Sequence, residues 1–72
     1  MTPNEVARVQ AYLRQTFGND NIHVAMPERP DAPCEMSIEG EFLAIIFRDE
    51  DDGEVSYALN MSILEEDLAP DQ

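Results

Sequence analysis

Several residue types are scarce or missing in this chain of 72 residues. It has no lysine and no tryptophan, one histidine (His23), one cysteine (Cys34) and 3 glycines. A single cysteine cannot form an internal disulfide, and one cysteine with one histidine supplies too few ligands for a zinc site. The scattered glycines do not form a phosphate-binding loop. The sequence therefore indicates no catalytic residues, no cofactor and no metal centre, and we expect a protein that is not an enzyme.

Basic side chains are also scarce. Four arginines stand against 16 acidic residues, which gives a formal net charge of -12. Such a field repels nucleic acid and anionic membranes, and it attracts basic protein surfaces or cations. The longest apolar run, 42–47, is far shorter than a membrane-spanning helix. With an unpaired cysteine and no visible signal peptide, we expect a cytoplasmic protein.

The N-terminal segment has a strong helix signal. Thr2 and Glu5 have the spacing of a capping box, and Pro3 suits the first helical position. One apolar stripe follows at spacings of three and four residues: Val6, Val9, Leu13 and Phe17. Gly18 is placed to end the helix in a left-handed conformation. Hydrophobic residues make up 43% of the chain, so we expect this helix to pack on a folded core.

The rest of the sequence predicts four strands. They cover Ile22–Met26, Cys34–Ile38, Phe42–Phe47 and Val55–Leu59, and three prolines interrupt the connection between the first two. Ser62 and Glu65 suggest a second capping box and a short terminal helix. We therefore expect residues 1–72 to form one small α+β domain. Its N-terminal helix packs on a four-stranded antiparallel meander sheet, with a short C-terminal helix or turn.

The facing of the third strand decides which residues are exposed. With Glu39 and Gly40 as a two-residue turn, strict alternation pairs Met36 with Leu43 and Cys34 with Ile45. Placing Arg48 opposite Glu54 then directs Leu43, Ile45 and Phe47 toward the helix. The opposite face carries an apolar strip, which we expect to be an interaction surface: Phe42, Ala44, Ile46 and Ala58. Either the C-terminal residues Ile63, Leu64 and Leu68 fold back over this strip, or another molecule covers it.

A role in protein interaction follows as the main hypothesis. The apolar strip and the acidity predict an adaptor or interaction module that binds a protein partner or a second copy of itself as a homodimer. The acidic turn 49–54 suggests an alternative, a small-ligand or cation-binding module, although its spacing does not match an EF-hand. A further alternative is a charge mimic of nucleic acid. Catalysis by Cys34 and His23 is disfavoured because alternation places them on opposite faces.

Three stretches of the chain resemble a known family. They are AYLRQTFGN, the hairpin IEGEFLAIIFRDEDDGEVSYALNM, and the ending ILEEDL. They are similar to a family of short acidic alphaproteobacterial proteins that is known only as a domain of unknown function. The resemblance covers nearly the whole chain and is most specific from Gly40 to Leu68. It implies a bacterial cytoplasmic protein, and it transfers no activity, cofactor or site residue.

Overall fold

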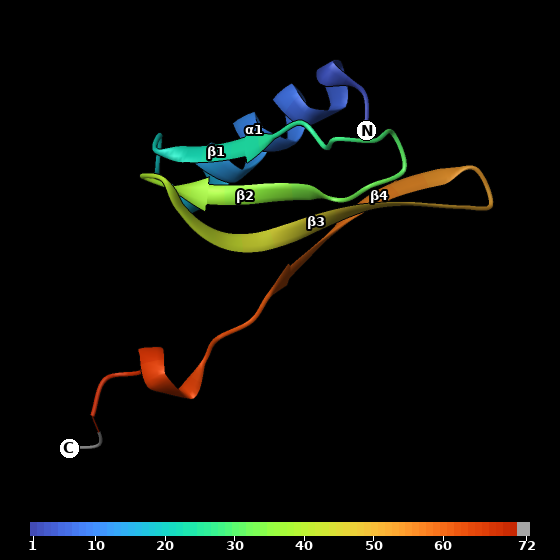
Figure 1. Ribbon diagram of the computed structural model, residues 1–72. Helices are drawn as coiled ribbons and strands as arrows, with labels where there is room; N and C mark the ends of the chain where they lie inside the picture. The colour runs from blue at the N-terminus through green and yellow to red at the C-terminus, as the bar shows by residue number, and fades with distance from the viewer. Residues whose placement is uncertain (71–72) are drawn as a thin grey trace.

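The computed structural model describes residues 1–70. Its elements are helix α1 (Pro3–Phe17), strands β1 (Ile22–Ala25), β2 (Cys34–Ile38), β3 (Glu41–Asp51) and β4 (Glu54–Met61), and the 3-10 turn η1 (Glu65–Asp67). The strands form one antiparallel sheet in the order β1-β2-β3-β4, and α1 lies against one face of it (Figure 1). The expected fold class is confirmed, and β1 and β4 are the two edge strands.

Helix α1 begins and ends as its sequence predicts. The Thr2 side chain accepts a hydrogen bond from the Glu5 backbone N–H, and the Glu5 carboxylate accepts one from the Thr2 backbone N–H, which completes the capping box. At the other end Gly18 adopts a left-handed conformation with φ 62°. Val6 and Leu13 of the apolar stripe are buried, whereas Phe17 is 59% exposed.

The hydrophobic core lies between α1 and the sheet. Its buried members are Val6, Leu13, Ile22, Val24, Cys34, Met36, Ala44 and Ile46. Four of these eight come from β1 and β2, and α1 lies next to β1. Two side-chain contacts fix the helix on this edge strand: Arg14 Nε donates to the Ile22 carbonyl at 2.8 Å, and the Gln10 side chain accepts from the Val24 backbone N–H at 3.0 Å.

The expected facing of β3 is wrong. Ala44 and Ile46 are each 2% exposed and lie in the core, and Phe47 is 42% exposed. The cause is a β-bulge. The turn at Glu39 and Gly40 forms as expected, but Ser37 pairs with Phe42 while Met36 pairs with Ala44. Leu43 is therefore the extra residue, and one extra residue reverses the facing of every residue after it.

The second hairpin also differs from its expected form. Asp52 and Gly53, with φ of 52° and 81°, make a two-residue turn, and Asp51 pairs directly with Glu54. The strands therefore continue into the acidic segment that was expected to be a loop. Phe47 pairs with Ala58 and Ile46 with Leu59, so Leu59 keeps its expected position on the helix side of the sheet.

The C-terminal segment does not cover the sheet. After β4 the chain continues away from the domain, as the lower left of Figure 1 shows. The second capping box is absent, since the N-cap residue of η1 is Leu64 rather than Ser62 and no side chain caps the turn. Ile63, Leu64 and Leu68 are 67%, 52% and 52% exposed. No helix found between residues 1 and 70 is long and apolar enough to cross a membrane.

Candidate interaction surface

One helix is too narrow to cover this sheet. Four strands at about 4.8 Å spacing make a sheet face roughly 19 Å wide, whereas a helix with its side chains is about 10 Å across. Because α1 lies over the β1 side, the helix-facing residues of β4 are left partly open. Leu59 and Met61 are 40% and 52% exposed, although their alternation directs them to the same face as the core.

Two adjacent hollows follow this uncovered strip, and together we call them the α1–β4 groove. The larger has a volume of about 500 Å³ and is lined by Arg8, Val9, Tyr12, Leu13, Ile46, Tyr57 and Leu59. The smaller, of about 220 Å³, is lined by Phe17, Asn19, Ile22, Met36, Ile38, Leu43, Ala44, Leu59 and Met61. Leu59 belongs to both hollows. The groove therefore runs along α1, and its lining is mostly apolar.

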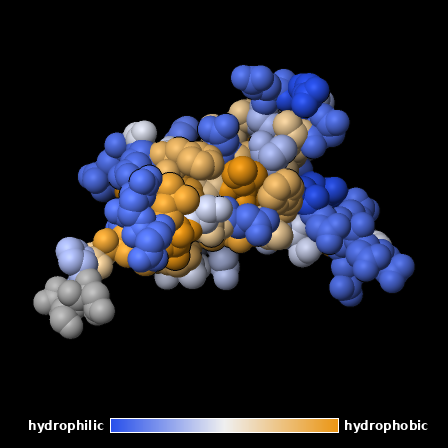
Figure 2. All heavy atoms as spheres, turned by 60° about the horizontal axis from the view of Figure 1, so that its bottom comes forward, coloured by the Kyte–Doolittle hydropathy of each residue, from blue (hydrophilic) through white to orange (hydrophobic). Residues whose placement is uncertain are grey.

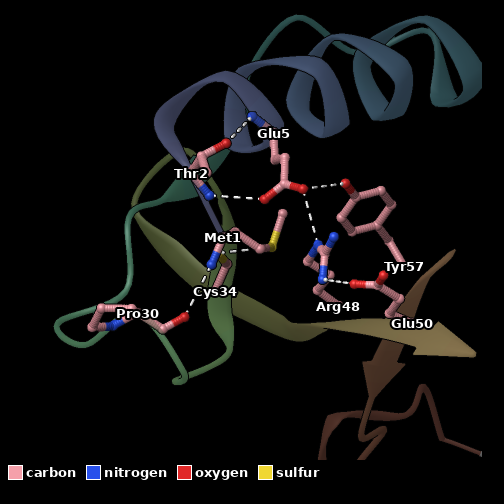
Figure 3. A network of polar contacts seen from close by, with 8 residues as sticks. All are labelled: Met1, Thr2, Glu5, Pro30, Cys34, Arg48, Glu50 and Tyr57. Carbon is pink, nitrogen blue, oxygen red and sulfur yellow. Dashed lines mark hydrogen bonds and ion pairs between the residues drawn. The ribbon is translucent and has the colours of Figure 1, made fainter. Parts of the chain in front are cut away.

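A polar network joins the start of α1 to β3 and β4 beside this groove. The Glu5 carboxylate accepts hydrogen bonds from Arg48 Nε at 2.9 Å and from the Tyr57 hydroxyl at 3.2 Å (Figure 3). Arg48 also donates to Glu50 at 3.1 Å. The hydrogen bond from the Thr2 backbone, followed by that from Arg48, lowers the pKa of Glu5 from 4.5 to about 2. The network holds the wall of β3 and β4 against the helix.

Cys34 and His23 lie apart, as expected. Cys34 is fully buried in the core, and its thiol lies 3.3 Å from the thioether of Met1. Burial raises the pKa of the Cys34 thiol, so its protonated form is favoured. His23 is exposed and pairs with Ser37 on the other face of the sheet. The structure therefore does not bring a base to the cysteine.

The expected interaction strip is not continuous. Of its four residues, Ala44 and Ile46 are core residues because the bulge reverses β3. Phe42 and Ala58 are exposed on the back of the sheet, where Phe42 pairs with Ser37 and Ala58 with Phe47. The apolar back face is thus formed by Phe42, Ile45, Phe47 and Ala58. A role for Phe42 and Ala58 in binding stays a prediction.

The acidic hairpin does not concentrate its carboxylates. Residues 49–51 and 54 belong to paired strands, and successive side chains of a strand point to opposite faces. Glu50 is already paired with Arg48. Within residues 1–70 no group of three or more histidine, cysteine or acidic side chains is arranged to hold a metal ion. The cation-binding hypothesis therefore gains no support from the geometry.

The outer edge of β4 is a further open feature. This strand is last in the sheet order, so one side of its backbone has no neighbouring strand. Its segment 55–61, VSYALNM, contains no charged residue and no proline, the two features that usually protect an edge strand from pairing. The groove, the edge and the exposed C-terminal residues all lie on the β4 side of the molecule.

The molecule exposes more surface than a compact monomer of its size. Its accessible area is 5777 Å², whereas a mass of 8.1 kDa corresponds to about 4,500 Å². Its radius of gyration is 13.8 Å, against about 11 Å for a compact chain of this length. Figure 2, in which the bottom of Figure 1 is turned forward, shows hydrophobic atoms gathered in the middle of the molecule and hydrophilic atoms at its right end. The excess of about 1,300 Å² exceeds the roughly 800 Å² that each partner buries in a stable interface.

Sequence reasoning missed the groove for an identifiable reason. Tyr12 lies outside the apolar stripe of the helix, and alternation alone predicts a buried Leu59, whereas Tyr12 is 66% and Leu59 40% exposed. The comparison of one helix with four strands was available from the sequence, since it needs only the number of elements and their widths. The bulge at Leu43 has no comparable signal, because no glycine or proline marks it.

Comparison with known proteins identifies a family but no activity. The model of a family described as "Protein of unknown function (DUF3126)" matches residues 5–67. No curated protein and no solved structure matches the chain.

Proposed function

We propose that this chain, which belongs to the DUF3126 family of proteins of unknown function, is a non-enzymatic protein-association module. Its β4 side is the interface, and the α1–β4 groove is the centre of that interface. The observation that carries the proposal is the half-covered sheet: Leu59, Met61 and Tyr12 are 40%, 52% and 66% exposed around an apolar groove. A second protein layer over the groove would remove this apolar area from water.

A small-molecule site is the second candidate, because the larger hollow has a ligand-sized volume of about 500 Å³. Three features favour a protein over a small molecule as the partner. Arg8 is the hollow's only charged lining residue, and the Tyr57 hydroxyl is already bonded to Glu5. The apolar surface also continues beyond the hollow to Met61 and the C-terminal segment, which a small ligand would leave exposed.

The distribution of charge favours a second copy over a basic partner at this surface. The acidic residues of the hairpin and of η1 flank β4, but residues 55–61 themselves are uncharged. Two chains of charge -12 repel each other at long range, so salt should strengthen self-association by screening. Salt would weaken the binding of a basic adaptor target. The salt dependence of the binding affinity therefore has opposite signs for the two types of partner.

We propose a bacterial protein of the cytoplasm, in keeping with its resemblance to short acidic alphaproteobacterial proteins and with its buried, unpaired Cys34. The reducing compartment would keep this thiol unmodified.

Light scattering and sedimentation equilibrium on the purified chain test the proposal. We expect an oligomer that strengthens with salt, and we expect Leu59→Ser to weaken it because Leu59 lines both hollows. Tyr12→Ser provides a second groove variant on an exposed helix position. Met26→Ser is the matched control, since Met26 is 50% exposed beside the opposite edge strand. If both groove variants behaved as the control does, the proposal would be wrong.

A further inference from the structure

The structure points to the occupant of the α1–β4 groove. We infer that the C-terminal segment 62–68 of a second copy lies in it, and that the two copies exchange these segments reciprocally. This inference rests on the proposed function, and it adds the identity of the partner and of the segment that binds.

The chemistry of the segment matches that of the groove. Leu64 and Leu68 stand at the two ends of η1, and with Ile63 they form an apolar group that is more than half exposed. A short turn with leucine at each end is suited to insertion of both leucines into an apolar hollow. The groove is lined by leucine, isoleucine, valine, methionine and aromatic side chains. Each surface would cover what the other leaves exposed.

One charge in the groove also fits this occupant. Arg8 lines the larger hollow and makes no ion pair with any other residue in 1–70. The segment carries Glu65, Glu66 and Asp67 between its leucines. When the leucines insert, these acids lie at the groove edge, where a guanidinium can bind a carboxylate. An acidic apolar segment is thus complementary to a groove whose only charged side chain is a cation.

The segment is long enough to span the groove. With the turn η1 at about 2 Å per residue and the other residues extended at about 3.3 Å, the chain from Met61 to Leu68 reaches about 19 Å. The stretch of α1 that borders the groove, from Arg8 to Phe17, is about 14 Å long. The segment can therefore cross both hollows of a neighbouring molecule without disturbing β4.

The direction of the chain favours exchange over folding back. The segment leaves β4 and extends away from its own groove, and Leu64 is itself in an extended conformation with ψ 142° (Figure 1). Covering its own groove would require a reversal directly after Met61. No glycine or proline lies between Gly53 and Pro70 to make one. Reciprocal exchange about a two-fold axis needs no reversal, and it closes the assembly at a dimer.

A complementation experiment tests the exchange on the full chain. The tail variant carries Leu64→Ser and Leu68→Ser, the groove variant carries Tyr12→Ser, and Met26→Ser is the control. All four positions are exposed, so we expect melting curves of the isolated domain to change little. Each variant loses its contact twice in a symmetric dimer, so its dissociation constant should rise at least about a hundredfold. The control should dimerise as the unmodified chain does.

Mixing the two variants is the decisive step. The tail variant keeps an intact groove, and the groove variant keeps an intact tail, so one of the two exchanged contacts re-forms in a heterodimer. Sedimentation velocity with one variant fluorescently labelled should show labelled dimers in the mixture at concentrations where each variant alone is monomeric. A synthetic peptide of residues 60–72 should compete with this heterodimer.

The other outcomes separate the inference from the proposed function. An unmodified chain that stays monomeric at millimolar concentration overturns the exchange, as does a mixture that forms no heterodimer. A tail variant that dimerises normally while the groove variant does not overturns the exchange but keeps the groove as an interface. If neither variant differs from the control, the exchange and the proposed function are both wrong.

Discussion

The two edge strands of the sheet, β1 and β4, both direct apolar side chains toward the helix side, but they have different surroundings. In β1 and β2 the helix-facing residues Ile22, Val24 and Cys34 are 0–3% exposed. In β4 Leu59 and Met61 are 40% and 52% exposed, although their pairing with Ile46 and Ala44 places them on the same face of the sheet. The comparison teaches that alternation determines the face to which a side chain points. Burial depends on a covering layer, and α1 supplies it for β1, β2 and the core residues of β3 but not for β4.

The uncovered part of the sheet is the physical reason for the proposed association. Hydrophobic stabilisation is proportional to the apolar area removed from water, at about 25 cal/mol per Å². A chain of 72 residues has little core to spare, since eight of the described residues 1–70 are buried hydrophobics. Covering Leu59 and Met61 would extend that core across the whole sheet.

The largest expected effect tests where the covered part of the sheet ends. Ile46→Asp places an unpaired charge in the core beside α1, because Ile46 is 2% exposed. We expect a loss of about 4 kcal/mol, which is comparable with the whole unfolding free energy of a small domain. Circular dichroism during urea titration should show a largely unfolded protein.

The neighbouring residue is the control for this prediction. Phe47 points to the opposite face and is 42% exposed, so Phe47→Asp should cost only about 1 kcal/mol. The facing deduced from strict alternation predicts the reverse order of the two variants. A folded Ile46→Asp protein with an unfolded Phe47→Asp protein would therefore contradict the bulge.

The pair of Ile46 and Phe47 also shows how much of the structure could be predicted from the sequence. The capping box of Thr2 and Glu5 and the left-handed Gly18 depend on neighbours in the chain, and both were predictable from local chemistry. The facing of a residue in β3, by contrast, depends on the number of residues that separate it from the turn at Glu39 and Gly40. One bulge at Leu43 was enough to move Ala44 and Ile46 from the expected interaction surface into the core.

The candidate site was less predictable than the fold. Phe42 and Ala58 are exposed as expected, but the groove depends on Tyr12 and Leu59, which meet only after α1 takes its position over β1. That position depends on contacts such as the one from Arg14 to the Ile22 carbonyl, which no sequence period indicates. The sequence therefore predicted an exposed apolar surface, but two of the four residues assigned to it, Ala44 and Ile46, lie in the core.

A second prediction compares β1 and β4 through a valine-to-alanine substitution in each strand. Val24 of β1 is 3% exposed, and Val55 of β4 is 43% exposed. Val24→Ala should reduce the unfolding free energy by about 2 kcal/mol, since it removes two buried methyl groups and leaves a cavity. Val55→Ala should cost less than about 0.5 kcal/mol in the monomer. Equal costs under monomeric conditions would show that β4 is as well covered as β1.

The smallest expected effect concerns the polar network of Glu5, Arg48 and Tyr57, which joins α1 to β3 and β4. Glu5 has a folded-state pKa of about 2, against an ordinary value of 4.5, chiefly because its carboxylate accepts hydrogen bonds from the Thr2 backbone and from Arg48. A lowered pKa means that the charged form is stabilised by folding. Its contribution is therefore complete above pH 4.5 and is lost as the pH falls from 4.5 to about 2.

Glu5→Gln isolates this contribution, because glutamine keeps a side-chain oxygen for the capping box but carries no charge to attract Arg48. Melting temperatures of the two proteins should differ by a few degrees near neutral pH and converge as the pH approaches about 2. Protonation of the other acidic residues relieves repulsion in both proteins alike, so the difference between them reports on Glu5. Glu28→Gln, which removes one charge from an exposed loop, controls for net charge. A difference that persisted unchanged in acid would mean that Glu5 acts through its shape and cap alone, and that its ion pair with Arg48 does not hold the uncovered part of the sheet to the helix.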